Sequence, residues 1–286
     1  MEIDEATLKG GGFIKLKQPD RFALRVKVLA GDTDPEQLRA IAGIAEKFGD
    51  GEVHFTVRQS VEIRGVSVED FDAIHAALRE AGLSTAACGP RVRAPVVCPG
   101  SATCKRGLSE TVGLAKRLDE ALAGSSILPH KFKIGVTGCS AQCAKPQEND
   151  LGFRGSVQPV FDERDGDCIA CGVCAAVCWP GAITLDADGR PVIDPTRCDF
   201  DGKCVSSCPT RAIRAQRLGW QVYIGGCFGS RPRLGVLAES FIDDDRAVDL
   251  AYAALDVYQR LGNRGERLRD VMDRIGHDEF IREVTR

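Results

Sequence analysis

The first hydrophobic pattern along the chain alternates with a period of two. It runs over residues 21–29 and again over residues 53–64. Such alternation predicts two β-strands, each with apolar side chains on one face and polar ones on the other. The polar faces carry Arg25, Lys27 and Arg58, so the sequence predicts a sheet face lined by cations, either solvated or part of a binding site. The apolar faces consist of Phe22, Leu24, Val26 and Val28, and of Val53, Phe55, Val57, Val61 and Ile63.

Each predicted strand is followed by an amphipathic helix. Asp34 and Pro35 are typical of a helix N-terminus, because aspartate caps free backbone N–H groups and proline suits the first helical position. Ser67 with Asp70 predicts a similar cap for the second helix. Two strand–helix units indicate an α+β domain, which we place over residues 1–85.

Further elements are predicted in the second half of the chain. Residues 129–137 and 220–224 have the pattern of strands, and Lys131 and Lys133 share one face of the first. Apolar residues at helical spacing over residues 245–284 predict two helices. We expect these helices to cover a core or to form a dimer contact rather than to carry a site.

Composition narrows the class of protein. The chain has 286 residues, enough for about two domains at roughly 150 residues each. With 43% hydrophobic and 28% charged residues and a net charge of −3, it is typical of a globular protein and not of a general nucleic-acid binder. No apolar run is long enough to span a membrane, and residues 1–10 lack a signal-peptide core. We therefore expect a cytoplasmic protein.

Cysteine spacing carries the most specific chemistry. The chain has 13 cysteines, and without an export signal these favour metal ligation over disulfides. Residues 168–178 contain C-x2-C-x2-C-x3-C, the bacterial ferredoxin pattern, in which the fourth cysteine serves the neighbouring cluster. Three more cysteines follow within residues 198–208. The two predicted ligand sets are Cys168, Cys171, Cys174 and Cys208, and Cys178, Cys198 and Cys204.

The second set lacks one thiolate. Asp201 stands three residues after Cys198 and three before Cys204, where the missing cysteine is expected. Either its carboxylate binds the fourth iron, or the cluster has three irons and Asp201 caps the turn before Gly202. Structural zinc is a weaker alternative, because zinc sites rarely repeat this spacing. The surrounding sequence is turn-rich and polar, so we interpret residues 162–218 as an inserted module.

Four further cysteines form two pairs of different spacing, C-x5-C and C-x3-C. The first pair is Cys98 and Cys104, and the second is Cys139 and Cys143. A net-acidic chain that concentrates cations beside such pairs is expected to bind a highly anionic ligand there. The cations near the pairs or after the glycine-rich turn at residues 225–229 are Arg91, Arg93, Lys105, Arg106, Arg231 and Arg233.

These pairs, together with three other motifs, resemble the sirohaem-dependent sulfite and nitrite reductases. The motifs are TVRQSVEI at 56–63, LPHKFKIGVTGC at 128–139 and GGCFGSRPRLG at 225–235. The inserted ferredoxin pattern is most similar to that of the C-type subunit of anaerobic sulfite reductases and to that of the dissimilatory type. The resemblance implies an α+β fold, with a ferredoxin-like half-domain over residues 1–85 and a sirohaem and [4Fe-4S] domain over residues 86–286, interrupted by a two-cluster ferredoxin module.

The resemblance also assigns roles to residues. Cys98, Cys104, Cys139 and Cys143 are expected to hold a cubane, with Cys143 bridging to the sirohaem iron. Arg58, Arg93, Lys131 and Lys133 are expected to surround the substrate, with Arg91 as the alternative to Arg93. Sirohaem carries eight carboxylates, which accounts for the many cations. Its expected ligands are Cys143, Arg25, Lys27, Gln59, Arg91, Lys105, Arg106, Arg231 and Arg233.

The expected activity is six-electron reduction of sulfite to sulfide, with electrons relayed inward from a donor protein through two further [4Fe-4S] clusters. Nitrite reduction by the same haem is one alternative, and an electron-transfer subunit without its own haem site is another. Family enzymes carry two homologous halves and this chain supplies one, so a homo- or hetero-oligomer is expected. Cys88 and Cys227 fall outside the ligand sets and are expected to be small buried residues.

Overall fold

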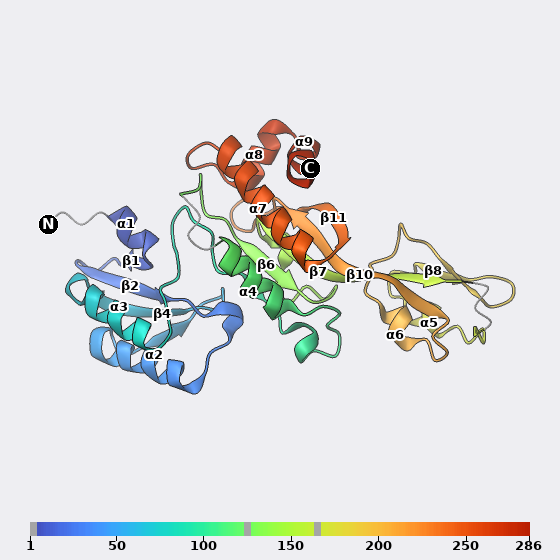
Figure 1. Ribbon diagram of the computed structural model, residues 1–286, viewed down its shortest axis with the longest axis horizontal. Coiled ribbons are helices and arrows are strands. Elements are labelled where there is room, and N and C mark those ends of the chain that lie inside the picture. Colours follow the sequence, from blue (N-terminus) through green and yellow to red (C-terminus); the bar gives the residue numbers. More distant parts are fainter. Residues whose placement is uncertain (1–4, 123–126, 163–166) are drawn as a thin grey trace.

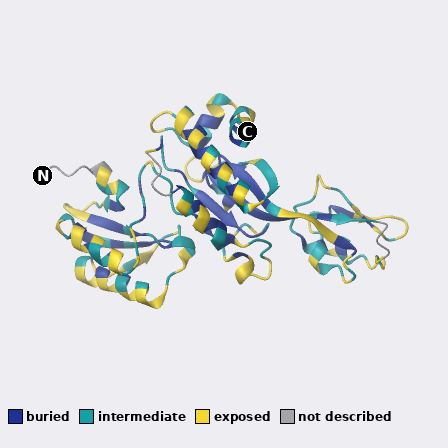
Figure 2. Cartoon of the chain, viewed as in Figure 1, coloured by how far each residue is buried: buried dark blue, intermediate teal, exposed yellow. Residues whose placement is uncertain are grey.

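The structure is a computed structural model that describes residues 5–122, 127–162 and 167–286. It contains an N-terminal half-domain, a central domain and a small lobe, which follow one another along the long axis of the molecule (Figure 1). Buried residues concentrate in the half-domain and the central domain, whereas the lobe is mostly exposed or half-buried (Figure 2). Among the described helices, none is both long and apolar enough to cross a membrane.

The half-domain is an antiparallel sheet in the order β1-β2-β4-β3 packed on two helices. The alternating residues of the second strand bury Phe22, Leu24 and Val26, as the sequence predicted. Asp34 caps its helix through a capping box with Gln37, also as predicted. Its elements are α1 (Glu5–Gly10), β1 (Phe13–Lys15), β2 (Arg21–Val26), α2 (Pro35–Phe48), β3 (Val53–Phe55), β4 (Val61–Ser67) and α3 (Phe71–Glu80).

Two expectations for the half-domain are wrong. Residues 53–64 form a hairpin and not one strand, because the chain turns at Gln59, which has a φ of +59°. Phe55 and Val57 consequently lie outside the core, with 69% and 99% of their surface exposed. The second helix begins at Phe71 without a side-chain cap from Ser67 or Asp70, since a short 3-10 turn precedes it.

The central domain is a mixed sheet in the order β11-β10-β7-β6-β5. Its strands are β5 (Val96–Val97), β6 (Ile134–Thr137), β7 (Leu151–Phe161), β10 (Ile213–Ile224) and β11 (Val236–Ile242). Strands β5, β6 and β7 run parallel, and β7, β10 and β11 run antiparallel. The predicted strand at 129–137 is shorter than expected, since Lys131 and Lys133 precede β6 in an extended segment.

Helices cover this sheet and complete the main core. One is α4 (Thr111–Leu122), and three come from the C-terminal part: α7 (Asp244–Leu261), α8 (Leu268–Ile275) and α9 (His277–Thr285). The sequence predicted two C-terminal helices, but Gly276, with a φ of +97°, separates α8 from α9. Their apolar faces are buried against the sheet, so the expected role as core cover is confirmed. Short 3-10 turns lie at Leu29–Gly31, Val68–Asp70, Gly100–Ala102 and Pro146–Glu148.

The lobe extends from the far end of β7 and β10, which remain paired out to Phe161 and Ile213. It consists of α5 (Val173–Val177), β8 (Ile183–Leu185), β9 (Pro191–Ile193) and α6 (Lys203–Ser207). Its core is small and built largely from cysteine and isoleucine side chains. Part of the polar linker expected before the lobe, residues 163–166, lies outside the described residues.

Candidate active site

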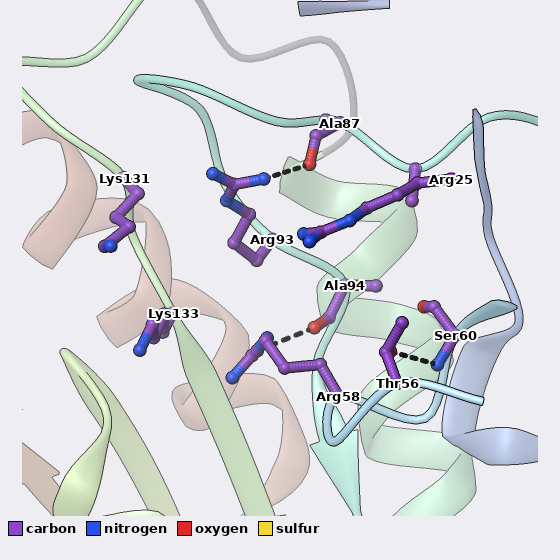
Figure 3. Close-up of a pocket in the computed structure, with 10 residues that line it drawn as sticks. Arg25, Thr56, Arg58, Ser60, Ala87, Arg93, Ala94, Lys131 and Lys133 are labelled. Atoms are coloured by element: carbon purple, nitrogen blue, oxygen red, sulfur yellow. Dashed lines mark hydrogen bonds between the residues drawn. The ribbon is translucent and has the colours of Figure 1, made fainter. Parts of the chain in front are cut away.

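A cavity of about 140 Å³ lies between the half-domain and the central domain. Arg25, Arg58, Arg93, Lys131 and Lys133 line it, and none of its other lining residues is acidic. Figure 3 shows the two lysines on one side, facing the three arginines on the other. The structure therefore brings together all four predicted substrate residues and one predicted sirohaem ligand. We call this cavity the cation pocket.

Arg58 reaches into the cation pocket from the hairpin turn of the half-domain. Its guanidinium donates to the backbone oxygen of Ala94 at 2.9 Å and to Asn149 Oδ1 at 3.2 Å, both in the central domain. Burial, followed by the positive charges of Arg93 and Arg25, lowers the pKa of Arg58 to about 10. A group held among like charges in this way gains by binding an anion.

Arg93 and Arg25 are held in different ways. The Arg93 guanidinium donates to the backbone oxygens of Ala87 at 2.6 Å and Gly89 at 3.1 Å (Figure 3). Carbonyls orient the group without neutralising its charge. Arg25 pairs with Glu62 at 3.3 Å and also donates to Cys88 Sγ at 3.7 Å. Part of its charge is thus balanced before any ligand binds, and Cys88 is buried as expected.

The two lysines complete the positive side of the cation pocket. Burial lowers the pKa of Lys131, and the nearby charges of Arg267 and Arg93 lower it further. Burial also lowers the pKa of Lys133, followed by the charges of Arg58 and Lys131. Both groups are therefore better proton donors than an ordinary lysine.

A buried ion pair lies behind the lysines, and sequence patterns did not indicate it. Asp150 is fully buried, and its carboxylate accepts the backbone N–H of Lys133 at 2.9 Å. Arg267 donates to both of its oxygens, at 2.9 and 3.0 Å. The negative charge of Asp150 raises the pKa of Lys131 and Lys133 against the other influences. The pair therefore fixes the lysine segment and offsets part of the repulsion among the cations.

Gln59 has a different position from the one expected of a sirohaem ligand. Its amide nitrogen donates to the backbone oxygen of Val97 at 2.6 Å, and its amide oxygen accepts the Val97 N–H at 2.7 Å. Both ends of the side chain are thus engaged by one residue of β5, immediately before Cys98. Gln59 joins the half-domain to the segment that carries the first cysteine pair.

The first two cysteine pairs come together near this junction. Burial raises the pKa of the Cys139 thiol, and the neighbouring Cys98, Cys104 and Cys143 raise it further. The two loops approach closely because glycines face each other: a Cβ on Gly107 would lie 2.4 Å from the carbonyl carbon of Gly100. We call these four residues the inner cysteine set.

The lobe brings together the other predicted ligands in two sets. Cys168, Cys171, Cys174 and Cys208 surround one small cavity. In the other set, burial raises the pKa of Cys204 to about 12, followed by the charges of Cys198, Asp201 and Cys178. Among the described residues, no three histidine, cysteine or acidic side chains gather as closely as a single metal ion requires. This spacing does not support structural zinc, whereas each thiolate of a cluster binds a different iron.

The remaining predicted sirohaem ligands lie outside the cation pocket. Lys27, which pairs with Asp119, and Arg91 line an adjoining cavity that shares Arg93 with it. Lys105 and Arg106 line a cavity between Cys139 and the lobe.

The two predicted arginines after the glycine-rich turn are engaged by helix α8. Arg231 pairs with Asp270 at 3.6 Å, and Arg233 pairs with Asp273. Neither residue lines the cation pocket. Sequence proximity to a motif therefore did not place these side chains at the pocket.

Comparison with known families places the chain in a class of enzymes. The model for the nitrite and sulphite reductase 4Fe-4S domain matches residues 88–286, and the model for the nitrite/sulfite reductase ferredoxin-like half domain matches residues 14–81. The chain belongs to the nitrite and sulfite reductase family. The family assignment and the α+β fold expected from the sequence are thereby confirmed.

Individual relatives agree with this assignment. The chain is 33% identical over 276 residues to the coenzyme F420-dependent sulfite reductase of Methanocaldococcus jannaschii, a match that covers 96% of this chain and 44% of the relative. It is 30% identical over 242 residues to the C-type subunit of the anaerobic sulfite reductase of Salmonella typhimurium, covering 78% and 70% of the two chains. A crystal structure of dissimilatory sulfite reductase I has the same fold, with a TM-score of 0.75 at 18% identity over 92% of this chain and 69% of that one.

Proposed function

We propose that this chain reduces sulfite to sulfide at a sirohaem coupled to a [4Fe-4S] cluster. The observation that carries the proposal is the cation pocket, where five cations line one cavity without an acidic residue among its lining. Hydrogen bonds of Gln59 and Arg58 connect this pocket to the segments that carry the inner cysteine set. A site for a small oxyanion thus lies beside a site for a redox cluster.

The residues present fit these cofactors. Four thiols converge in the inner cysteine set, and cations suited to carboxylates line the cation pocket and the cavity beside it. By the family resemblance, Cys143 would be the thiolate shared between cluster and haem. When bound, the haem iron supplies a site for the substrate sulfur and the cluster supplies electrons one at a time.

The chain's own side chains would bind and protonate the substrate. The guanidinium groups of Arg58 and Arg93 present fixed forks of N–H donors, which suit the oxygens of sulfite. Backbone carbonyls already hold Arg93 in place, so little ordering is needed on binding. Lys131 and Lys133 carry protons at lowered pKa, and each oxygen that leaves sulfur as water requires two protons.

The lobe is proposed to relay electrons toward the inner cysteine set. Its two ligand sets follow the ferredoxin spacing, and one of them encloses a cavity. A second cavity lies between the lobe and the inner set, with Asp201 on one side and Cys139 on the other. The electron donor is expected to be a separate protein or subunit, and the expected homo- or hetero-oligomer stays part of the proposal.

Anaerobic purification tests the proposal directly. We expect a sirohaem absorption band, iron and acid-labile sulfide, and sulfide production from sulfite with a reduced viologen as donor. Iron without a haem band would instead indicate an electron-transfer subunit. Nitrite is the second candidate, because the family model covers both substrates and the cation pocket selects charge. A higher kcat/KM for nitrite than for sulfite would replace sulfite as the proposed substrate.

A further inference from the structure

The two cysteine loops of the lobe repeat each other in backbone conformation. Ala170 and Phe200 have φ values of +53° and +55°, and Gly172 and Gly202 have values of +72° and +70°. Each loop then enters a five-residue helix, α5 in the first loop and α6 in the second. In this repeat, the position of Cys171 in the first loop corresponds to that of Asp201 in the second.

The two oxygens of Asp201 have different surroundings. Oδ1 accepts the backbone N–H of Lys203 at 3.0 Å and so caps the turn before α6. Oδ2 is buried, and no donor among the described residues lies within hydrogen-bond distance of it. Lys203 Nζ is 3.7 Å away, an ion-pair distance but too long for a hydrogen bond. A cap requires one oxygen only, so the cap does not account for the burial of Oδ2.

Three cysteines share this environment with Asp201. Cys178 and Asp201 both act on the thiols of Cys198 and Cys204. Four groups that are anionic when they bind metal are thus gathered in one partly buried place. Such a gathering is favourable when cationic metal lies among the groups.

We propose that Asp201 Oδ2 is the fourth protein ligand of this set, while Oδ1 holds the turn. The inference rests on the proposed iron–sulfur function of the lobe and makes it more specific. A carboxylate is a harder ligand than a thiolate, so it holds iron less firmly in a sulfur-rich cluster. The iron at Asp201 is therefore the exchangeable one, and the two clusters of the lobe differ in stability.

The position of Asp201 gives this difference a functional meaning. The backbone N–H of Val157 in β7 donates to the Phe200 oxygen at 2.9 Å, so the second loop is joined to the central domain. Figure 1 shows α6 on the side of the lobe nearer that domain. Asp201 also lines the cavity that Cys139 lines from the other side. The aspartate-ligated set thus stands between the other lobe set and the inner cysteine set.

The test uses the full chain, purified anaerobically, with iron analysis and electron paramagnetic resonance as readouts. We expect mild oxidation to remove one iron per chain and give the signal of a three-iron cluster, and added Fe²⁺ to restore the original form. Asp201→Cys is expected to resist this loss. Asp201→Asn, which keeps an oxygen for the cap but lacks the carboxylate, is expected to contain one iron fewer before oxidation.

Cys171→Asp is the matched control, because it places a carboxylate at the equivalent position of the other loop. It is expected to create a second exchangeable iron. The proposal is overturned if Asp201→Asn keeps the iron content of the unchanged chain, if Asp201→Cys contains one iron more than that chain before oxidation, or if Asp201→Cys loses iron as readily. These outcomes concern lobe iron alone, whereas failure of the proposed enzyme would appear as an absent haem band with lobe iron retained.

Discussion

The cation pocket and the lobe are assembled in opposite ways. The pocket takes Arg25 and Arg58 from the half-domain and Arg93, Lys131 and Lys133 from segments of the central domain. The lobe takes its cysteines from two short loops that repeat one spacing and one backbone conformation. The pocket therefore depends on how two domains meet, whereas each loop is largely specified by its own few residues.

This difference predicts how each region responds to mutation. A change at the domain junction should weaken the pocket and leave lobe iron unchanged. A change in a cysteine loop should do the reverse. The inner cysteine set lies between these cases, because its ligands come from two separated loops and one of them follows the strand that Gln59 contacts.

The largest effect is expected for Cys143→Ser. Loss of the proposed shared thiolate should abolish sulfite reduction and leave the lobe iron in place, because Cys143 belongs to neither lobe set. Activity with a reduced viologen and iron per chain measure the two effects. Cys227→Ala is the control, since Cys227 is buried beside Arg269 and outside all three sets. Wild-type turnover by Cys143→Ser with haem still bound would exclude this role.

Arg58→Ala is expected to lower sulfite turnover about a hundredfold, equivalent to about 3 kcal/mol of lost transition-state stabilisation. Its charge acts directly in the cation pocket, so lobe iron should not change. Arg64→Ala is the control, because Arg64 lies on the same hairpin but pairs with Glu62 at the surface. Equal kinetics for the two variants would remove Arg58 from the substrate site.

Gln59→Leu sharpens the comparison at the junction itself. It removes two hydrogen bonds to the buried residue Val97, and at about 1 kcal/mol each it should lower the free energy of unfolding by about 2 kcal/mol. Denaturant unfolding measures this loss, with Gln37→Leu as the control in an exposed capping box. Affinity for sulfite should fall together with stability. A stable variant with unchanged affinity would show that the junction does not depend on this side chain.

The smallest effect concerns pH. Burial and the charges of Arg58 and Lys131 lower the pKa of Lys133, so its positive charge is lost at a pH below that of an ordinary lysine. Because an anion binds the charged form, KM for sulfite should rise about tenfold for each pH unit above that pKa. Lys133→Arg should move this rise to higher pH. Identical pH profiles for the two proteins would contradict the assignment.

Sequence patterns predicted more of the lobe than of the pocket. The spacing of residues 168–178 and 198–208 gave the two ligand sets, and the repeat located Asp201. Alternation gave the strand of Arg25 but extended the strand of Arg58 through a turn, because a hairpin with an exposed Phe55 keeps the same alternation. Proximity in sequence was a poor guide for Arg231 and Arg233, which helix α8 engages.

Local spacing and residue chemistry thus determined the family, the α+β class and which cysteines belong together. Tertiary structure alone decided that Gln59 joins two domains, that Asp150 and Arg267 support the lysine segment, and that one oxygen of Asp201 is buried without a donor among the described residues. The physical reason is range. A turn or a metal-ligand loop is specified by neighbouring residues, whereas burial and pairing of charges depend on segments that only folding brings together.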